Sequence, residues 1–402
     1  MEVFMKAKMM KKVLGIMLGA SMMMGLIGCG TGASGTTSAP ADTAGSEAQT
    51  TEASEAVASD ATGGNVQVGI VLPTKDEPRW IQDETRFAAI LDEAGFTYQV
   101  LFSQGNSATE KSNVETLISQ GAQVLIICPH DATAVASAVQ EAHDAGVTVV
   151  SYDRLINDTD AIDYVVGFDS KSVGTAQGNY LIENAEGTGN PLYLYAGAQT
   201  DENAYIFFEG AWEVLQPKIA DGTFRIINSK EAIKLQDKPV LEREDQAAIL
   251  GEITNNWDFN VQKSKAEADL TSAAAEDKGT VYILAPNDGT SRAAADVFAT
   301  DKDVDQYYIT GQDAEVASIQ YIIDGKQSMT VLKDTRLLTD AAVAMAQEII
   351  GGGEVTTNTV YDNNAKEVPM NELQVISVTK DSVKADIIDS GYYEASQFTG
   401  LE

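Results

Sequence analysis

The stretch VVSYDRLI, residues 149–156, contains the feature on which the rest of the sequence depends. Its first residues are typical of a buried strand, and Asp153 and Arg154 stand where that strand gives way to a loop. In an open parallel α/β sheet, small molecules bind in the crevice outside the carboxyl ends of the strands. The pair is therefore either a local ion pair that fixes the loop, or two groups that bind adjacent hydroxyls of one small polar molecule.

Strands and helices alternate on both sides of this stretch. The sequence predicts strands at VQVGIVLP, TYQVLF, QVLIICP, VTVVSYD and AIDYVVGFD, and the alternation restarts at PLYLYAG and continues to SMTVLKD and the helix after it. Residues 230–256 are expected to be irregular. Because the strands are apolar nearly throughout, we expect parallel sheets with helices on both faces. The sequence therefore predicts an α/β fold with two doubly wound lobes and a cleft between them.

The first 64 residues have a different composition. Lysines between residues 6 and 12 precede an apolar run that ends in LIGC at Cys29, which is the arrangement of a secretory signal peptide. The ending resembles a bacterial lipobox, in which the Cys becomes the lipid-modified first residue; an ordinary signal peptide with a chance Cys is the alternative. We expect a signal peptide at 1–28 and a lipid-anchored flexible tether at 29–64, rich in Ala, Ser, Thr and Gly.

Composition excludes several classes of function. Acidic residues outnumber basic ones by 60 to 27, and the net charge of −33 argues against binding to nucleic acid or to an anionic bilayer face. Cys128 stands in VLIICP, where core packing is its expected role. His130 and His143 have no Cys or carboxylate cluster at ligand spacing, so we expect neither a metal site nor a cofactor.

Polar or aromatic side chains follow strand after strand. Each one could be a helix cap, a turn residue or a core residue, but their recurrence at seven strand ends or turns predicts that they share one cleft. Asp288, beside Asn287, is an equal candidate there. Planar Asp, Asn and Arg groups suit the hydroxyls of a monosaccharide, and two Trp rings suit the C–H faces of its ring. The candidate binding residues are Arg79, Trp80, Asp153, Arg154, Asn203, Trp257, Asn287, Asp313 and Lys333.

Six motifs, in order along the chain, resemble the multiple-sugar and xylose-binding group of periplasmic-type solute-binding proteins: PTKDEPRW, SYDRLI, ENAYIFFEGAWEVLQP, APNDG, GQDAE and LKDTR. The resemblance implies a type I periplasmic binding protein fold, in which two Rossmann-like lobes are joined by three crossovers. It places one lobe at 66–167 plus 334–374 and the other at 168–333 plus 375–402. It also implies that the nine candidate residues bind the ligand.

The same resemblance implies that a monomer captures an aldopyranose such as xylose, glucose or galactose and delivers it to the permease of an ABC importer. With the lipid anchor, the protein would lie on the extracytoplasmic face of the membrane, at the surface of a Gram-positive-type cell or in a periplasm. Because closure around a single ring leaves no room for a second, we expect disaccharides to bind poorly.

Three alternative functions belong to other classes of protein. A sensor that presents its ligand to a membrane receptor without transport stays open, because no motif separates it from an importer component. A transcription regulator of the same fold would need a helix-turn-helix segment before Val66, where the signal peptide stands. An enzyme is not expected, because the sequence shows no nucleophile elbow, metal-ligand set or Gly-rich phosphate loop.

Overall fold

The computed structural model describes residues 65–401, so the predictions for 1–28, for 29–64 and for Cys29 lie outside the described residues. Two lobes are present, and both belong to one compact unit. Within residues 65–401, no helix combines the length and the apolar character needed to cross a membrane.

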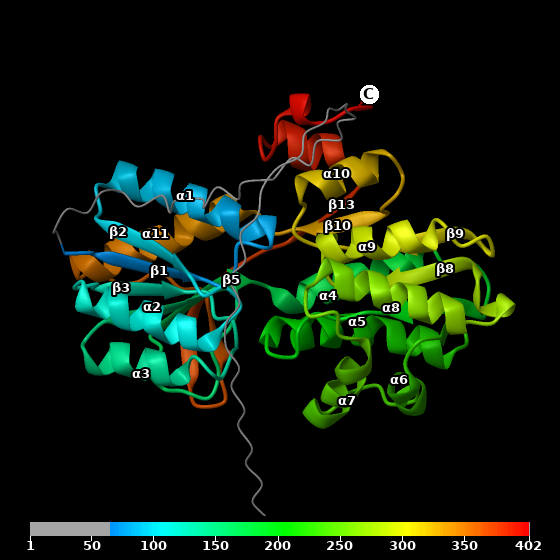
Figure 1. Ribbon diagram of the computed structural model, residues 1–402, viewed down its shortest axis with the longest axis horizontal. Coiled ribbons are helices and arrows are strands. Elements are labelled where there is room, and N and C mark those ends of the chain that lie inside the picture. Colours follow the sequence, from blue (N-terminus) through cyan, green and yellow to red (C-terminus); the bar gives the residue numbers. More distant parts are fainter. Residues whose placement is uncertain (1–64, 402) are drawn as a thin grey trace, which may run out of the picture. The chain divides into compact units, whose positions relative to one another are not determined.

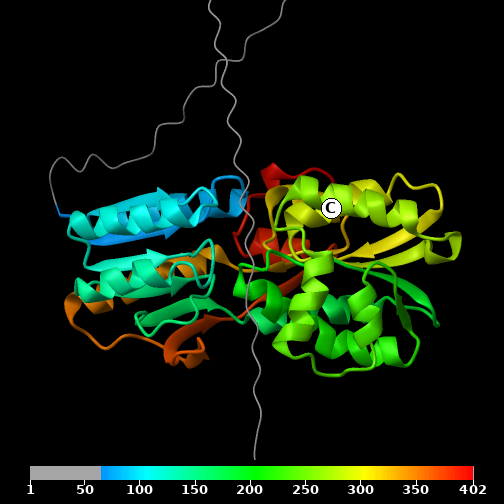
Figure 2. The ribbon, with the colours of Figure 1, turned by 60° about the horizontal axis from the view of Figure 1, so that its bottom comes forward.

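The first lobe is built on a seven-stranded sheet in the order β11-β12-β5-β4-β3-β1-β2. All neighbours are parallel except the edge pair β11 and β12, which lies at the opposite edge from β2 (Figure 2). The strands are β1 (Val68–Leu72), β2 (Tyr98–Phe102), β3 (Val124–Ile127), β4 (Thr148–Tyr152), β5 (Tyr164–Phe168), β11 (Thr359–Asp362) and β12 (Glu367–Leu373). One face is covered by α1 (Pro78–Ala94) and α11 (Thr335–Gly351), and the other by α2 (Ser107–Ser119) and α3 (Ala136–Asp144) (Figure 1).

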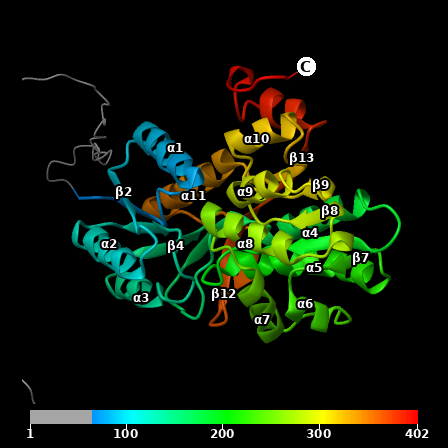
Figure 3. The same ribbon diagram turned by 45° about the vertical axis from the view of Figure 1, so that its right-hand side comes forward.

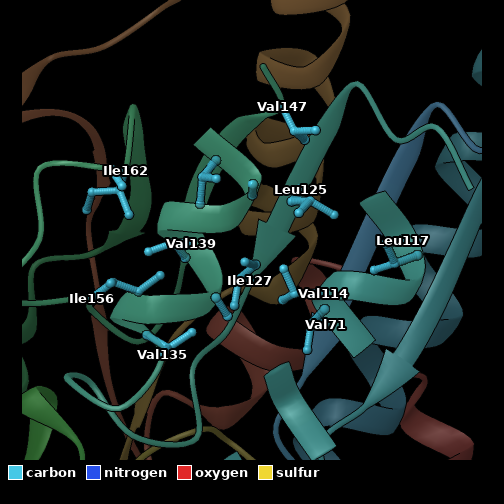
Figure 4. Packing of buried hydrophobic residues seen from close by; sticks show 14 of the residues in the cluster. Val71, Val114, Leu117, Leu125, Ile127, Val135, Val139, Val147, Ile156 and Ile162 are labelled. Atoms are coloured by element: carbon cyan, nitrogen blue, oxygen red, sulfur yellow. The ribbon is translucent and has the colours of Figure 1, made fainter. Parts of the chain in front are cut away.

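Alternating strand residues fill the two layers of this lobe. In β1, Ile70 packs with α1 and α11, whereas Val71 packs with the cluster that also contains Leu125 and Val139 (Figure 4). Because successive strand side chains point to opposite faces, a sheet covered on both faces needs apolar residues at nearly every position. This requirement explains the continuous apolar strands of the sequence.

The second lobe has the four-stranded parallel sheet β7-β6-β8-β9 and a separate antiparallel pair, β10-β13. Its strands are β6 (Asn190–Leu194), β7 (Phe224–Ile226), β8 (Gly279–Leu284), β9 (Val304–Ile309), β10 (Met329–Leu332) and β13 (Ile376–Thr379). Core clusters join α4 (Ser170–Glu183) and α5 (Glu202–Ala220) to one face, and α8 (Phe259–Ser272) and α9 (Asp288–Phe298) to the other. The predicted α/β class with parallel, doubly wound sheets is confirmed.

The expectation that 230–256 is irregular was wrong. This stretch contains α6 (Lys230–Leu235) and α7 (Arg243–Ile253). Ser229 caps α6, and Glu242 and Asp245 form a capping box for α7. The face of α7 that is buried begins at Gln246 and continues at helical spacing, so the helical signal was present but short.

The chain passes between the lobes three times, from β5 to α4, from β10 to α11 and from β12 to β13. The C-terminal segment after β13 packs on α10 (Val316–Ile323), as Figure 3 shows in red. It also contacts the first lobe, where Gln82 Nε2 donates to Tyr393 Oη at 2.9 Å and the Arg86 guanidinium lies 5.3 Å from the Tyr392 ring centroid. The segment therefore bridges the two lobes.

Helices α4 and α5 approach each other at glycines. A Cβ on Gly174 would lie 1.7 Å from the carbonyl oxygen of Phe207, and one on Gly210 would lie 2.1 Å from that of Lys171. Only hydrogen fits at such positions, so these two glycines let the backbones touch. The contact matters for the cleft, because α5 begins there and α4 follows directly after a connection between the lobes.

We predict that Gly174→Ala lowers the free energy of unfolding by about 1–3 kcal/mol or more, because the added methyl group collides with backbone. The matched control is Gly251→Ala in α7, where a Cβ meets no atom of the described chain within 4 Å. The control should be neutral or raise stability by up to about 1 kcal/mol. Urea unfolding of both variants checks this, and equal stability of the two would contradict the close helix contact.

Candidate functional site

An inner cavity lies between the lobes, at the carboxyl ends of the strands. The structure brings all nine candidate residues together in its lining. The cavity has a volume of about 20 Å³, enough for about one water molecule. Four further residues, which the sequence analysis did not select, complete the lining: Glu77, Asp201, Phe207 and Gln312.

Asp153 is the centre of a buried group of charges. Its Oδ2 accepts hydrogen bonds from Arg79 Nη1 and Nη2 at 3.2 and 3.1 Å, and Lys333 Nζ lies 3.4 Å away. Burial by itself would raise the pKa of Asp153, but Lys333, Arg79 and Arg154 together lower it to about 2. Asp153 therefore remains a carboxylate at every physiological pH.

Arg154 does not form the local ion pair with Asp153 that was one alternative. Its Nε lies 2.9 Å from Asp201 Oδ2, in the other lobe, and its Nη2 lies 3.4 Å from Glu77 Oε1. Asn203 also connects the two lobes here, because its Nδ2 donates a hydrogen bond to the carbonyl oxygen of Asp153 at 3.1 Å. The strand-end pair thus has polar partners in both lobes, with Arg79 and Glu77 in its own lobe and Asp201, Asn203 and Lys333 in the other.

The two tryptophans of the cavity have different surroundings. Trp80 has the guanidinium carbons of Arg79 and Arg154 at 4.8 and 5.1 Å from its ring centroid. Trp257 lies edge-on to Phe207, with ring centroids 6.3 Å apart. A Cβ on Gly197 would lie 2.0 Å from the Trp257 ring, so Gly197 provides the space that the indole occupies.

Three candidate residues have left-handed backbone conformations, with φ of 58° at Asp153, 61° at Trp257 and 97° at Asp313. Residues other than glycine rarely adopt such angles, and the cost is about 1–3 kcal/mol each. Such strain is concentrated at functional sites, where the surrounding structure holds it in place. Here the strained backbone directs the side chains of Asp153, Trp257 and Asp313 toward the same cavity.

The choice between Asn287 and Asp288 is decided by burial. Asn287 lines the cavity, while its Oδ1 caps α9 by accepting from the amide of Thr290. Asp288 is fully buried and accepts hydrogen bonds from Gln327 Nε2, Thr330 Oγ1 and the amide of Glu315. Burial raises the pKa of Asp288 well above its ordinary value. Asp288 therefore anchors the loop that carries Asp313, and Asn287 faces the cavity.

Of the four further lining residues, Asp201 and Gln312 follow strands in the sequence but were not among the nine predicted binding residues, whereas Glu77 and Phe207 had weak signals. Phe207 follows Asn203 by four residues, so both lie on one face of α5. Gln312 precedes Asp313, and Asp201 caps α5 through the amide of Asn203. Glu77 stands before Pro78, at the N-cap position of α1. Asp201 and Glu77 thus both stand at the start of a helix.

Cys128 is buried in the core of the first lobe and is a free thiol, as its expected packing role requires. In the part of the chain from 65 to 401, no three His, Cys, Asp or Glu side chains are grouped so that they could hold a metal ion. The lining of the cavity instead combines ionised groups, amides and indoles, which suits a neutral molecule rich in hydroxyl groups.

Comparisons with known proteins agree with this geometry. A family model described as a periplasmic binding protein domain matches residues 68–354. A multiple sugar-binding periplasmic protein from Azospirillum brasilense is 32% identical over 341 residues, covering 82% of this chain and 90% of that protein. A D-xylose-binding periplasmic protein from Escherichia coli is 29% identical over 332 residues, covering 83% of this chain and 92% of that protein. The crystal structure of a carbohydrate transporter solute binding protein from Chloroflexus aurantiacus, in complex with D-glucose, has a TM-score of 0.82 and 61% identity, covering 83% of this chain and 98% of that chain.

We predict that Asp153 makes stability depend on pH in the acid range. Because its pKa is about 2 in the folded protein and 3.8 ordinarily, its contribution is complete above about pH 5 and is lost progressively as the pH falls toward 2. The contribution corresponds to about 2 kcal/mol. Asp153→Asn should therefore lose less unfolding free energy than the parent between about pH 5 and pH 3.

Urea unfolding at several pH values measures this difference, and subtracting the two curves cancels the other titrating groups. Asp303→Asn, a replacement of a partly exposed carboxylate, is the control and should follow the parent curve. Parallel curves for the parent and Asp153→Asn would show that Asp153 is not held charged by its neighbours.

Proposed function

Because the chain belongs to the periplasmic binding protein family, we propose that it binds a monosaccharide in the inner cavity and delivers it to the permease of an ABC importer. The ligand class is an aldopyranose such as glucose, xylose or galactose. The named relatives bind multiple sugars or D-xylose, and the similar crystal structure holds D-glucose. We expect the protein to act as a monomer and to release the sugar unchanged.

The observation that carries the proposal is the convergence of the nine residues on one cavity, three of them with strained backbone. A pyranose offers hydroxyl groups at its edge and C–H groups on its faces. Asp153 and Asp313 would accept from hydroxyls, while Arg79, Arg154 and Lys333 would donate to them. The indoles of Trp80 and Trp257 would stack on the faces.

Unpaired polar atoms of the lining support a ligand with both donors and acceptors. Four buried atoms find no hydrogen-bond partner among residues 65–401: Arg79 Nε, Trp80 Nε1, Trp257 Nε1 and Gln312 Oε1. A buried polar group without a partner costs about 1–3 kcal/mol. A sugar hydroxyl can donate to the amide oxygen and accept from the indole N–H, so binding would remove this cost.

The small volume of the inner cavity requires movement during binding. We propose that the lobes, 66–167 plus 334–374 and 168–333 plus 375–402, rotate apart about the three connections and close over the sugar. Contacts that would then break and re-form include Arg154–Asp201 and the hydrogen bond from the Ala132 amide to the Thr200 carbonyl oxygen, at 2.9 Å. Closure excludes water and strengthens each polar contact with the sugar.

We also propose that Cys29 carries a lipid that holds the protein at the extracytoplasmic face of the membrane, with 29–64 as the tether. The support is the LIGC motif after an apolar run and the low-complexity composition that follows it.

The central test is calorimetric titration with D-glucose, D-xylose and D-galactose. At least one should bind, and Trp257→Ala should weaken its binding by about tenfold or more, which corresponds to 1.4 kcal/mol. Asp313→Ala should weaken binding further, because it leaves buried donors unpaired. Lys302→Ala, whose side chain is mostly exposed, is the control and should bind like the parent.

The proposal fails if none of the three sugars binds the parent, or if both variants bind like the parent. Small-angle scattering of the same samples adds a test of closure, because the radius of gyration should fall when the sugar saturates the parent. An unchanged scattering profile at saturation would count against rotation of the lobes.

For the anchor, Cys29→Ser in the full-length precursor should move the protein from the membrane fraction to the soluble fraction or the medium, because no thiol remains for the lipid. Cys128→Ser is the control, since the buried thiol of the core has no part in anchoring. Fractionation followed by immunoblotting measures the distribution, and a membrane-bound Cys29→Ser protein would refute the lipid anchor.

A further inference from the structure

A second, larger cavity lies directly outside the inner one. This outer cavity has a volume of about 670 Å³, within the range of about 300–1,000 Å³ that small-molecule sites occupy. Its lining shares four residues with the inner cavity, so the two spaces meet there: Glu77, Arg154, Trp257 and Asn287.

Both lobes supply walls to the outer cavity. The first lobe contributes Pro73, Thr74 and residues 76–78 after β1, and His130 after β3. The second lobe contributes the continuous segment 256–260 together with Arg292 and Glu315, which form an ion pair at 2.6 Å. The space is therefore part of the cleft between the strand ends, and a molecule in the inner cavity could extend into it.

Phe259 is the feature of this wall that points to a ligand. It is 41% exposed, an unusual environment for a large aromatic side chain, and most of the other residues that line the cavity have polar side chains. An exposed aromatic ring in polar surroundings suits the C–H face of a sugar ring. Asn256 and Asn260 line the same cavity on either side of it in sequence and offer amide groups to hydroxyls.

The segment that carries Phe259 is held rigidly. Asn256 and Trp257 both have left-handed backbone, with φ of 56° and 61°. The buried Asn255 accepts from the amide of Trp257 at 3.0 Å and donates to Gln262 Oε1 at 2.9 Å, while Asp258 caps α8. One short turn thus places Trp257 where the two cavities meet and Phe259 in the wall of the outer one. Such preorganisation reduces the entropy lost on binding.

We propose that the outer cavity is a second sugar subsite, so that the protein also binds disaccharides and glycosides. The terminal pyranose occupies the inner cavity, and the next ring or aglycon lies against Phe259. This inference rests on the proposed function and departs from the expectation that disaccharides bind poorly. That expectation assumed closure around one ring, whereas the closed cleft of this structure keeps a large space beside the inner cavity.

The experiment compares D-glucose with methyl β-D-glucopyranoside, cellobiose, maltose and lactose by calorimetric titration of the parent, Phe259→Ala and Val261→Ala. Val261 is the matched control, because it is an exposed apolar residue of the same helix outside the lining of the cavity. At least one disaccharide should bind the parent, and Phe259→Ala should weaken that binding by about tenfold. D-Glucose binding should change by less than about twofold in both variants.

The outcomes separate this inference from the proposed function. A parent that binds D-glucose but no disaccharide or glycoside up to about 10 mM overturns the second subsite and leaves the proposed function intact. Equal weakening of glucose and disaccharide by Phe259→Ala, or weakening by Val261→Ala to the same extent, also overturns the subsite. A parent that binds no sugar at all overturns both.

Discussion

The buried carboxylate of Asp153, surrounded by Arg79, Lys333 and Arg154, is the interaction on which the rest of the cleft depends. These three cations also contact Asp83, Asp201 and Asp313, so the buried group contains three cationic and four acidic side chains. Compared with apolar residues of similar volume, buried ion pairs add little net stability, because removal of the charges from water costs about as much as their attraction returns. Here the ion pairs fix the positions of these side chains, because removal of any one member would leave its partners unpaired.

The strained backbone also serves to position side chains of the site. Left-handed backbone at Asp153, Trp257 and Asp313 is unfavourable, and it persists because neighbouring groups leave each residue no alternative. The fully buried Asp288 ties down the loop that carries Asp313, and Gly197 gives the Trp257 ring its space. The groups that hold the site are therefore different from the groups that line it.

The lobes show a similar division between parts that give rigidity and parts that contact the ligand. Apolar layers on both faces of each sheet make the lobes rigid, while the contacts between the lobes at the cleft include polar ones such as Arg154–Asp201 and the hydrogen bond from Asn203 to the Asp153 carbonyl oxygen. Polar contacts can be exchanged for contacts with water or with a ligand at small net cost, whereas an apolar core cannot be opened without loss of stability. An assembly of this kind is suited to reversible closure on a polar molecule.

The sequence by itself determined the class of fold and most of the cleft. Apolar strands alternating with amphipathic helices leave only a doubly wound parallel sheet, and in such a sheet the residues that follow the strands must meet at one edge. All nine candidate residues could be found in this way because each stands at a strand end or at the turn into a helix. Phe207 escaped because its signal is a helical spacing from Asn203 and not a place after a strand.

Only the tertiary structure decided how these residues are used. Asp153 and Arg154 are neighbours in sequence, yet they contact different partners, Lys333 and Asp201, which are distant along the chain. The sequence left Asn287 and Asp288 equal, and burial against Gln327 and Thr330 separated them. The outer cavity is formed by segments of both lobes, and no pattern within one segment predicts a space between two. Local patterns specify elements and their order, but cavities and ion-pair partners arise from contacts between residues far apart in the chain.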